Sequence, residues 1–237
     1  MPEGEGLSTA VPVESEKPVG PRSRKGIQTR ARLVDAAKEI FKEYGFLDAR
    51  ISDIAERAGL SHGAFYHYFD SKEEIFREVA AGVDEELSEP LSEVILARSS
   101  TATPHERIAE AIRLHLEAYR DEAKIMGVIE QVSHYDDEVR ARRHARYKHD
   151  NAQVAGSIRQ LQLRGLADPE LDPAIAAVGV GAMTSRFAEM WFGQGFIDCD
   201  FEEGVEQLTR LFVNALQLKD KADRTDDGGT RRPDNPR

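Results

Sequence analysis

Several features that define other classes of protein are scarce in this sequence or missing from it. Cysteine occurs once, at Cys199, so the chain cannot form an internal disulfide or a cysteine-based metal cluster. The aspartates on either side of Cys199 raise rather than lower the pKa of a thiol, which argues against a reactive cysteine. No apolar run approaches the roughly 18 residues that cross a bilayer, and the acidic first ten residues do not resemble a signal peptide. We therefore expect a cytoplasmic protein that does not associate with membranes.

Catalytic motifs are missing as well. The sequence contains no phosphate-binding loop, no nucleophile elbow, no HExxH motif and no cysteine pair. Its seven histidines do not stand at metal-site spacings from carboxylates or from the cysteine. We expect a protein that is not an enzyme and that has no cofactor and no metal site.

Strand patterns do not occur, whereas helical spacing recurs along the chain. No segment alternates apolar and polar residues with a period of two over the length of a strand, and helix-starting residues such as Thr103-Pro104 and Asp172-Pro173 are frequent. The prediction is an all-α fold. Its predicted helices cover 26–44, 51–58, 61–69, a segment from Ser71 that Pro90 kinks or ends, 104–120, 122–134, 136–164, 173–192 and 201–218.

The formal net charge of −11 is distributed unevenly. Residues 1–16 carry a net charge of −4, residues 17–80 carry +2 and the remainder carries −9, while residues 17–32 contain six bases and no acid. A basic block beside an acidic body is expected where one end of a protein approaches nucleic-acid phosphates. A solvated basic tail explains the same charges equally well.

Residues 51–69 contain two short helical segments joined by a turn around Gly59. This is the pattern of a helix-turn-helix. Alanines allow the two helices to cross closely, and Ile54, Leu60 and Phe65 supply a small shared core. The second segment begins with small or polar residues only, so its N-terminal end can enter a major groove.

The spacing of these residues resembles that of the TetR family of transcriptional regulators over about residues 25–80. The matching positions are Phe41 to Gly45, Asp53-Ile54-Ala55, Ala58-Gly59, Ser61, Gly63, Phe65-Tyr66, Tyr68-Phe69 and Ser71-Lys72-Glu73. The resemblance implies a helix-turn-helix DNA-binding domain at 21–75 and a helical ligand-binding and dimerisation domain at 76–218. Residues 1–20 and 219–237 lack periodicity and are predicted to be a disordered leader and a disordered tail.

The resemblance also implies roles for single residues in binding double-stranded operator DNA. The groups expected to face phosphate are Ser61, Tyr66, His67, Tyr68 and Lys72. The groups expected to face base edges are His62, Gly63 and Ala64. Arg24 and Arg30 are expected to reach phosphate or the minor groove. Arg50 stands where many relatives have Ser or Thr, so either the cap of the second helix is lost or Arg50 contacts DNA.

Packing offers a competing explanation for some of these positions. Phe65 and Phe69 match the buried face of their segment and are predicted to be core. Tyr68 fits the edge of the core almost as well as a DNA contact, and His67 fits an exposed bystander. For Tyr66 and Lys72 we favour phosphate contact, because an amphipathic tip and a cation both suit it.

The last two helices are expected, from the resemblance, to pair with their copies in a homodimer. Two-fold symmetry then requires a palindromic operator. The small residues Gly179, Gly181 and Ala182 allow close approach of the helices. The apolar area of the interface is predicted to come from Met183, Phe187, Met190, Leu208, Leu211 and Phe212.

A pocket for a small-molecule effector is expected among the middle helices. Its predicted apolar lining is Leu116, Tyr119, Met126, Ile129, Phe187 and Trp191, with Glu130, Ser133 or Tyr147 as polar anchors. Ordinary core packing explains each apolar residue at least as well. The lining favours a largely apolar effector, while the bases of the 136–164 helix either attract an acidic ligand such as an acyl-coenzyme A or form a solvated face.

Two other classes of function compete with a regulator. An enzyme has no motif in its favour, and a helical adaptor would use the helix-turn-helix only as a packing unit. The basic block before the first helix argues against the adaptor. Since repression is the usual role in the family, the resemblance predicts a repressor that its effector releases from the operator.

Overall fold

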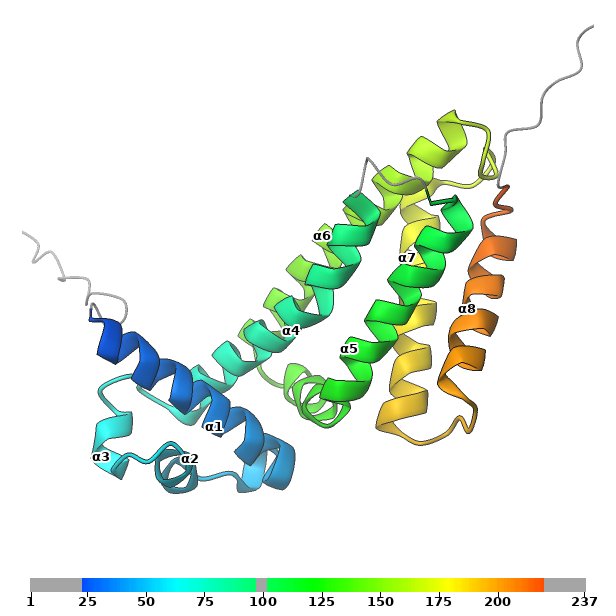
Figure 1. The fold of residues 1–237 in the computed structure, drawn as a ribbon. Coiled ribbons are helices and arrows are strands. Elements are labelled where there is room, and N and C mark those ends of the chain that lie inside the picture. Colours follow the sequence, from blue (N-terminus) through cyan, green and yellow to red (C-terminus); the bar gives the residue numbers. More distant parts are fainter. Residues whose placement is uncertain (1–22, 97–101, 220–237) are drawn as a thin grey trace, which may run out of the picture.

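The computed structural model of the protein describes residues 23–96 and 102–219, and every regular element within these ranges is a helix (Figure 1). The all-α prediction is confirmed. The helices are α1 (Arg24–Asp48), α2 (Ile51–Arg57), α3 (His62–Phe65), α4 (Lys72–Leu96), α5 (Pro104–Ser133), α6 (Asp137–Leu163), α7 (Pro173–Ala188), the π-helical segment η1 (Glu189–Gly193) and α8 (Phe201–Ala215).

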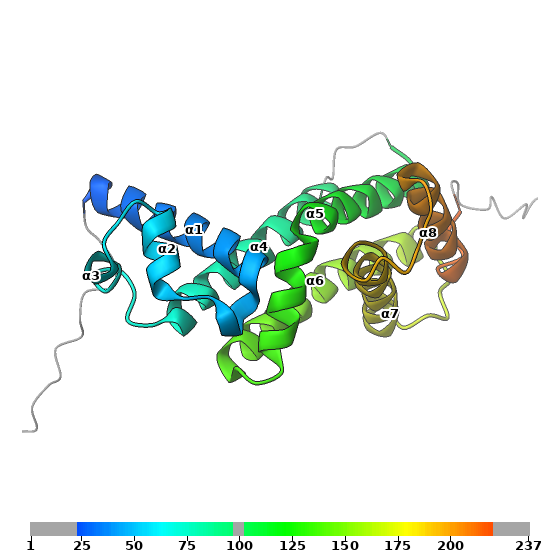
Figure 2. The same ribbon diagram turned by 90° about the horizontal axis from the view of Figure 1, so that it is seen from below.

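The helices form two groups connected by α4. Helices α1, α2 and α3 gather at one end of the molecule, and α4 runs from this group into the bundle formed by α5, α6, α7 and α8 (Figures 1 and 2). Helix α5 contacts α1 as well as α4, α6, α7 and α8. The predicted domain boundary at residues 75/76 falls inside α4, so this helix belongs to both groups. The predicted leader lies outside the described residues, as does the predicted tail except for Lys219.

Capping residues start the helices where the sequence places them. Thr103 and Glu106 form a reciprocal capping box at the start of α5, and Asp172 caps α7 in front of Pro173. Asp200 accepts the N–H groups of Glu202 and Glu203 at the start of α8. Each of these short-range signals is therefore confirmed.

Left-handed glycines end helical segments, as predicted. Gly45 interrupts α1 with φ of 72°, and Gly165 follows α6 with φ of 69°. Only glycine adopts this backbone conformation without a steric penalty, which explains why the chain turns at these residues.

Two predicted boundaries are wrong. Segments 104–120 and 122–134 form one helix, α5, because Arg120, Asp121 and Glu122 contain no helix breaker. The predicted 173–192 helix changes to a π-helical turn at Glu189. Of the two alternatives for Pro90, a kink or an end of the helix, the end is excluded because α4 continues to Leu96.

One continuous apolar core runs through both groups. In the N-terminal group the rings of Phe41, Phe46 and Phe76 pack together, with centroids 4.9–5.8 Å apart. In the C-terminal group Leu116 and Ile129 of α5 are fully buried. Within the described ranges, no helix combines the length and the apolar character needed to cross a membrane.

Candidate nucleic-acid interface

The turn between α2 and α3 is built by a glycine cap. Gly59 has φ of 68°, its N–H donates to the carbonyl of Glu56, and the N–H of Leu60 donates to the carbonyl of Ala55. These two bonds make a Schellman motif, which closes α2 and reverses the chain. Ile54 and Phe65 are both fully buried beside it, so a shared core holds the two short helices together. The predicted helix-turn-helix architecture is present.

The first turn of α3 is open to solvent. Ser61 precedes it and accepts the N–H of Ala64, while His62 and Gly63 are exposed and Ala64 is partly exposed. A Cβ atom built on Gly63 meets no other atom within 4 Å. The small-residue tip that the sequence predicts is therefore a free surface in this structure.

Three aromatic residues that follow the tip have different surroundings. Tyr66 is 46% exposed, and its ring lies 5.3 Å from the imidazole of His62. His67 is exposed, whereas Tyr68 is partly buried against the apolar core. The structure thus brings Ser61, His62, Tyr66 and His67 to one surface, with Tyr68 at its edge.

Lys72 has a different role from the one predicted. Its ammonium donates to the carbonyls of Phe46, Leu47 and Ala49 at 2.7, 3.2 and 3.0 Å, and it lies 4.7 Å from the centroid of the Phe46 ring. Three carbonyls use all three donors of an ammonium group. In this arrangement Lys72 joins the start of α4 to the α1–α2 loop and has no donor left for a phosphate.

The basic residues of α1 also divide between structural and exposed roles. Arg30 forms an ion pair with Glu78 of α4 and lies 4.6 Å from the centroid of the Phe69 ring, and Arg32 donates to the carbonyl of Ala58 at 2.8 Å. Arg24 is exposed at the start of the helix. The structure therefore uses Arg30 to join α1 to α4 and leaves Arg24 accessible to a partner.

Arg50 precedes α2 without capping it. Its side chain makes no capping hydrogen bond, so the cap expected from Ser or Thr at this position is lost. The side chain is exposed and lines a surface hollow of about 950 Å³ together with Tyr44 and Leu47. A DNA contact by Arg50 stays a prediction.

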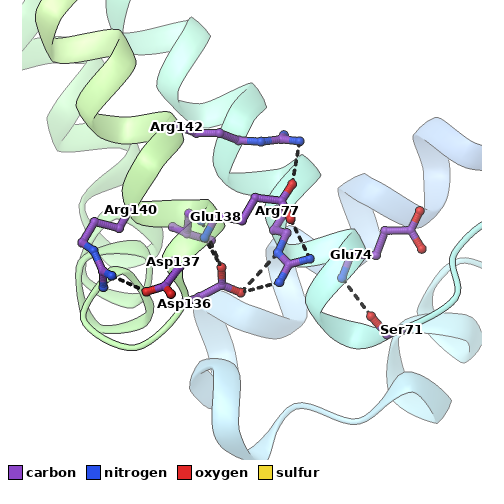
Figure 3. Close-up of polar contacts among 9 residues, drawn as sticks. Ser71, Glu74, Arg77, Asp136, Asp137, Glu138, Arg140 and Arg142 are labelled. Atoms are coloured by element: carbon purple, nitrogen blue, oxygen red, sulfur yellow. Dashed lines mark hydrogen bonds and ion pairs between the residues drawn. The ribbon is translucent and has the colours of Figure 1, made fainter.

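Helix α4 is joined to the α5–α6 loop by an ion-pair cluster (Figure 3). Arg77 binds Asp136 at 2.9 Å and Glu138 at 2.9 Å, and Glu138 also binds Arg142 at 3.0 Å. Burial alone would raise the pKa of Asp136, but hydrogen bonds from the Val139 N–H and from Arg77 outweigh it and hold the pKa below its ordinary value. Arg77 of α4 and Asp136, the residue that caps α6, are thus bonded to each other although they lie 59 positions apart.

Comparison with known proteins agrees with this geometry. Residues 33–79, from α1 to α4, match the family model for bacterial regulatory proteins of the tetR family. This part of the chain matches the TetR family. The sequence-based resemblance is therefore confirmed for the helix-turn-helix region, and the relatives that match are described as transcriptional regulators.

Curated TetR relatives match over limited lengths. The HTH-type transcriptional regulator YdgC of Bacillus subtilis is 47% identical over 55 residues, which cover 23% of this chain and 28% of the relative. The HTH-type transcriptional repressor KstR2 of Mycobacterium tuberculosis is 32% identical over 118 residues, which cover 46% of this chain and 58% of the relative. The chain thus spans between about a quarter and three fifths of the length of these relatives.

The whole fold has counterparts among solved TetR structures. A structure described as a TetR-family transcriptional regulator from Mesorhizobium loti superposes with a TM-score of 0.68 and 18% identity, over 81% of this chain and 98% of the other. This confirms the TetR architecture of an N-terminal helix-turn-helix domain followed by a C-terminal helical domain.

The predicted effector-binding residues differ in how deeply they are buried. The buried members of the set are Leu116, Tyr119, Met126, Ile129 and Trp191. The partly buried members are Phe187 and Ser133, and the exposed ones are Glu130 and Tyr147. Burial raises the pKa of the Tyr119 phenol to about 12. Glu130 and Tyr147 both contact the guanidinium of Arg143 at 2.8 Å, so the two predicted anchors meet at one cation.

The predicted dimer residues do not all lie on a surface. Leu208 and Phe212 are buried within the protomer, and Met183, Phe187 and Met190 are partly buried, so only Leu211 is fully available, with 53% exposure. The reason is that one face of α8 packs against α5. The exposed apolar surface of α7 comes instead from Ile175 and Val178, which the sequence reasoning did not select.

Several residues that organise the molecule were not found from the sequence. Arg77, Asp136 and Arg143 act through partners far away in the sequence or on another helix, and nothing in their local patterns predicts those partners. Cys199 is the opposite case: burial and then the nearby Glu203, Asp200 and Asp198 raise the pKa of its thiol, in the predicted direction.

Proposed function

We propose that this protein is a DNA-binding transcriptional regulator that acts as a repressor. It binds a palindromic operator as a homodimer, and a small-molecule effector releases it. The observation that carries the proposal is the exposed first turn of α3, with His62 and Gly63 at its tip. Such a tip suits the major groove because it lets the helix approach base edges closely.

Gly63 supports this proposal because neither packing nor backbone geometry requires glycine there. Its φ is not positive, and an added Cβ would meet open space. Alanine would be favoured over glycine in a helix by about 1 kcal/mol. The remaining physical reason for glycine at this position is that the missing side chain lets another molecule approach the helix closely.

Phosphate contacts are assigned to groups that stay accessible. Ser61, Tyr66 and His67 border the tip, and Arg24 and Arg50 lie exposed at the starts of α1 and α2. These contacts would fix the orientation of the domain on DNA, while the tip reads the bases. Tyr68, at the edge of the core, would contribute less than Tyr66.

The test is a fluorescence-anisotropy titration of the full chain with the DNA upstream of its own gene. Binding should weaken with salt by about 0.9 log units per log unit for each phosphate neutralised. Competitor DNA of scrambled sequence should bind far more weakly. Equal affinity for both duplexes would reject sequence-specific regulation, and no binding at low salt would favour the helical adaptor.

The dimer interface is assigned to the exposed face of α7 and α8. Ile175, Val178 and Leu211 are at least half exposed there, and Gly179 and Ala182 leave room for another helix. Replacement of Ile175 by Glu should convert dimers to monomers in light scattering. The matched control is Leu163→Glu, which is 75% exposed on α6 and should leave the dimer intact.

Effector control is assigned to α4, because this helix contacts both groups. Its start is fixed to the α1–α2 loop by Lys72, and Arg77 ties it to the α5–α6 loop. An effector that prefers a different placement of α4 would change the separation of the two α3 tips in the dimer. That difference in affinity between two arrangements is sufficient to lower operator binding.

A further inference from the structure

The interior of the C-terminal domain contains two polar atoms whose bonding is incomplete. Nη1 of Arg143 and Nε2 of His115 are buried, and neither has a hydrogen-bond partner among the residues that the structure describes. A buried guanidinium is costly unless its donors are satisfied. These atoms therefore mark a place where an additional group would be stabilised.

Arg143 is satisfied on one side only. Its side chain is 8% exposed, and its Nη2 donates to Glu130 and to the Tyr147 hydroxyl, each at 2.8 Å. Both partners are exposed residues, Glu130 by 51% for its side chain. The partners thus lie toward the surface, while the unsatisfied Nη1 is enclosed by protein.

Two rows of polar groups meet between α5 and α6. His115 and Tyr119 stand one turn apart on α5, with ring centroids separated by 6.3 Å, and Arg143 and Tyr147 stand one turn apart on α6. Helices α5 and α6 contact each other, and Arg143 of α6 bonds to Glu130 of α5, so the two rows lie on neighbouring helices. Burial lowers the pKa of His115 to about 4, which keeps the imidazole neutral near pH 7 with one N–H donor.

The acidic residues near these rows already have cationic partners. Glu130 binds Arg143, Glu189 binds Arg186 at 2.6 Å, and both Asp84 and Asp150 bind Arg146, at 2.7 and 3.3 Å. These four carboxylates are therefore already neutralised by a cation. The unused bonding capacity belongs to a guanidinium, which can only donate.

The helices that carry the rows also have buried apolar residues, and a hollow lies on a neighbouring face of α6. Leu116 and Ile129 of α5 are fully buried, and Trp191 is nearly so. The hollow, of about 480 Å³ between α4 and α6, has a lining that includes Asp84, Glu85, Arg142 and Arg146, and Arg146 stands one turn along α6 from Arg143.

We propose that the effector is an organic acid with an apolar body, and that its carboxylate binds Arg143 Nη1 between α5 and α6, with His115 and Tyr119 as further donors. A charge-assisted bond to a buried guanidinium is about twice as strong as a neutral one. This inference rests on the proposed function, since it names the class of molecule that controls the regulator.

The test compares acids with neutral analogues of the same shape. Octanoate and 1-naphthoate are titrated by calorimetry into the full-length dimer, in parallel with 1-octanol and 1-naphthalenemethanol. At least one acid should bind at least tenfold more tightly than its alcohol, and Arg143→Met should remove that advantage. The matched control is Arg159→Met, because Arg159 is exposed on the same helix and does not line the hollow between α4 and α6.

Three results would overturn the inference. They are binding of neither acid at millimolar concentration, equal affinity for acid and alcohol, or an equal effect of the Arg159 and Arg143 variants. If Arg143→Met does not fold, Arg143→Lys replaces it: a lysine keeps the charge, so the preference for the acid should shrink but persist.

Operator binding is measured on the same ligand-free samples to separate the two proposals. Specific DNA binding without acid binding would refute the effector class and leave the regulator intact. Absence of specific DNA binding would refute the regulator, whatever the acids do.

Discussion

The guanidinium of Arg77 in α4 binds the carboxylate of Asp136, the residue that caps α6, with 2.9 Å between Nη2 and Oδ2. The other oxygen of Asp136 accepts the N–H groups of Glu138 and Val139. One carboxylate therefore starts a helix of the C-terminal domain and ties it to α4, the helix that connects the two groups (Figure 3).

Replacement of Asp136 separates its two roles. Asp136→Asn keeps a capping oxygen and loses the ionic contact, whereas Asp136→Ala loses both. We expect the alanine variant to be less stable than the asparagine variant by about 1 kcal/mol, the usual value of an N-cap. Urea unfolding of both variants measures this difference, and equal stabilities would show that the cap contributes nothing.

The effect on regulation should follow the ionic contact instead. If Arg77 and Asp136 transmit the effector signal, both Asp136 variants should bind operator DNA but respond less to an effector than the unchanged protein does. Replacement of the exposed Asp137 by Asn, at the next position, is the control and should respond normally.

Lys72→Met tests the role that the structure gives to this lysine. Removal of the ammonium leaves the carbonyls of Phe46, Leu47 and Ala49 without its hydrogen bonds, which should cost about 1–3 kcal/mol of stability. Chemical denaturation measures this loss. A phosphate contact would behave differently: stability would be unchanged, and the salt dependence of DNA binding would fall by about one phosphate.

Gly204→Ala should destabilise the C-terminal domain. An added Cβ would lie under 3.0 Å from the indole ring of Trp191, so the ring or helix α8 must move, at a cost of about 1–3 kcal/mol. Gly156→Ala is the matched control, since its added Cβ meets nothing within 4 Å. The control should be stabilised by up to about 1 kcal/mol, as expected for alanine in a helix. Thermal melts of the two variants measure these effects. Similar shifts in Tm would contradict the packing of Trp191 on Gly204.

The low pKa of His115 predicts a loss of stability in mild acid. Burial lowers its pKa to about 4 in the folded protein, against about 6.5 in an unfolded chain. Between these values the unfolded state binds more protons, so the free energy of unfolding falls as the pH falls, by up to roughly 3 kcal/mol. Unfolding in urea at pH 7.5, 6.0 and 5.0 should show a shallower decline for His115→Gln. Parallel declines would mean that the imidazole titrates normally in the folded state.

The sequence predicted those features that depend on neighbouring residues. The capping box of Thr103 and Glu106, the cap at Asp172 and the turn at Gly59 each require only a few adjacent side chains, and all three are present. The exposed tip of α3 followed from the same local pattern, because small residues there leave nothing to bury.

Features that depend on tertiary packing could not be predicted in this way. Lys72 suits a phosphate contact by its charge, but the carbonyls it binds come from a loop more than 20 positions earlier in the chain. Leu208 and Phe212 have the apolar character of an interface, but α5 already covers them. Periodicity shows that a helix has an apolar face and does not show which partner covers that face.

The most direct test of the central claim is the DNA affinity of Gly63→Leu. The position is open in the free protein, so the variant should fold and melt like Gly156→Leu, its control on the exposed surface of α6. If the tip of α3 enters the major groove, the leucine will hold the helix away from the bases, and operator affinity will fall toward the non-specific level, on the order of a thousandfold. Operator affinity equal to that of the unchanged protein would contradict the account.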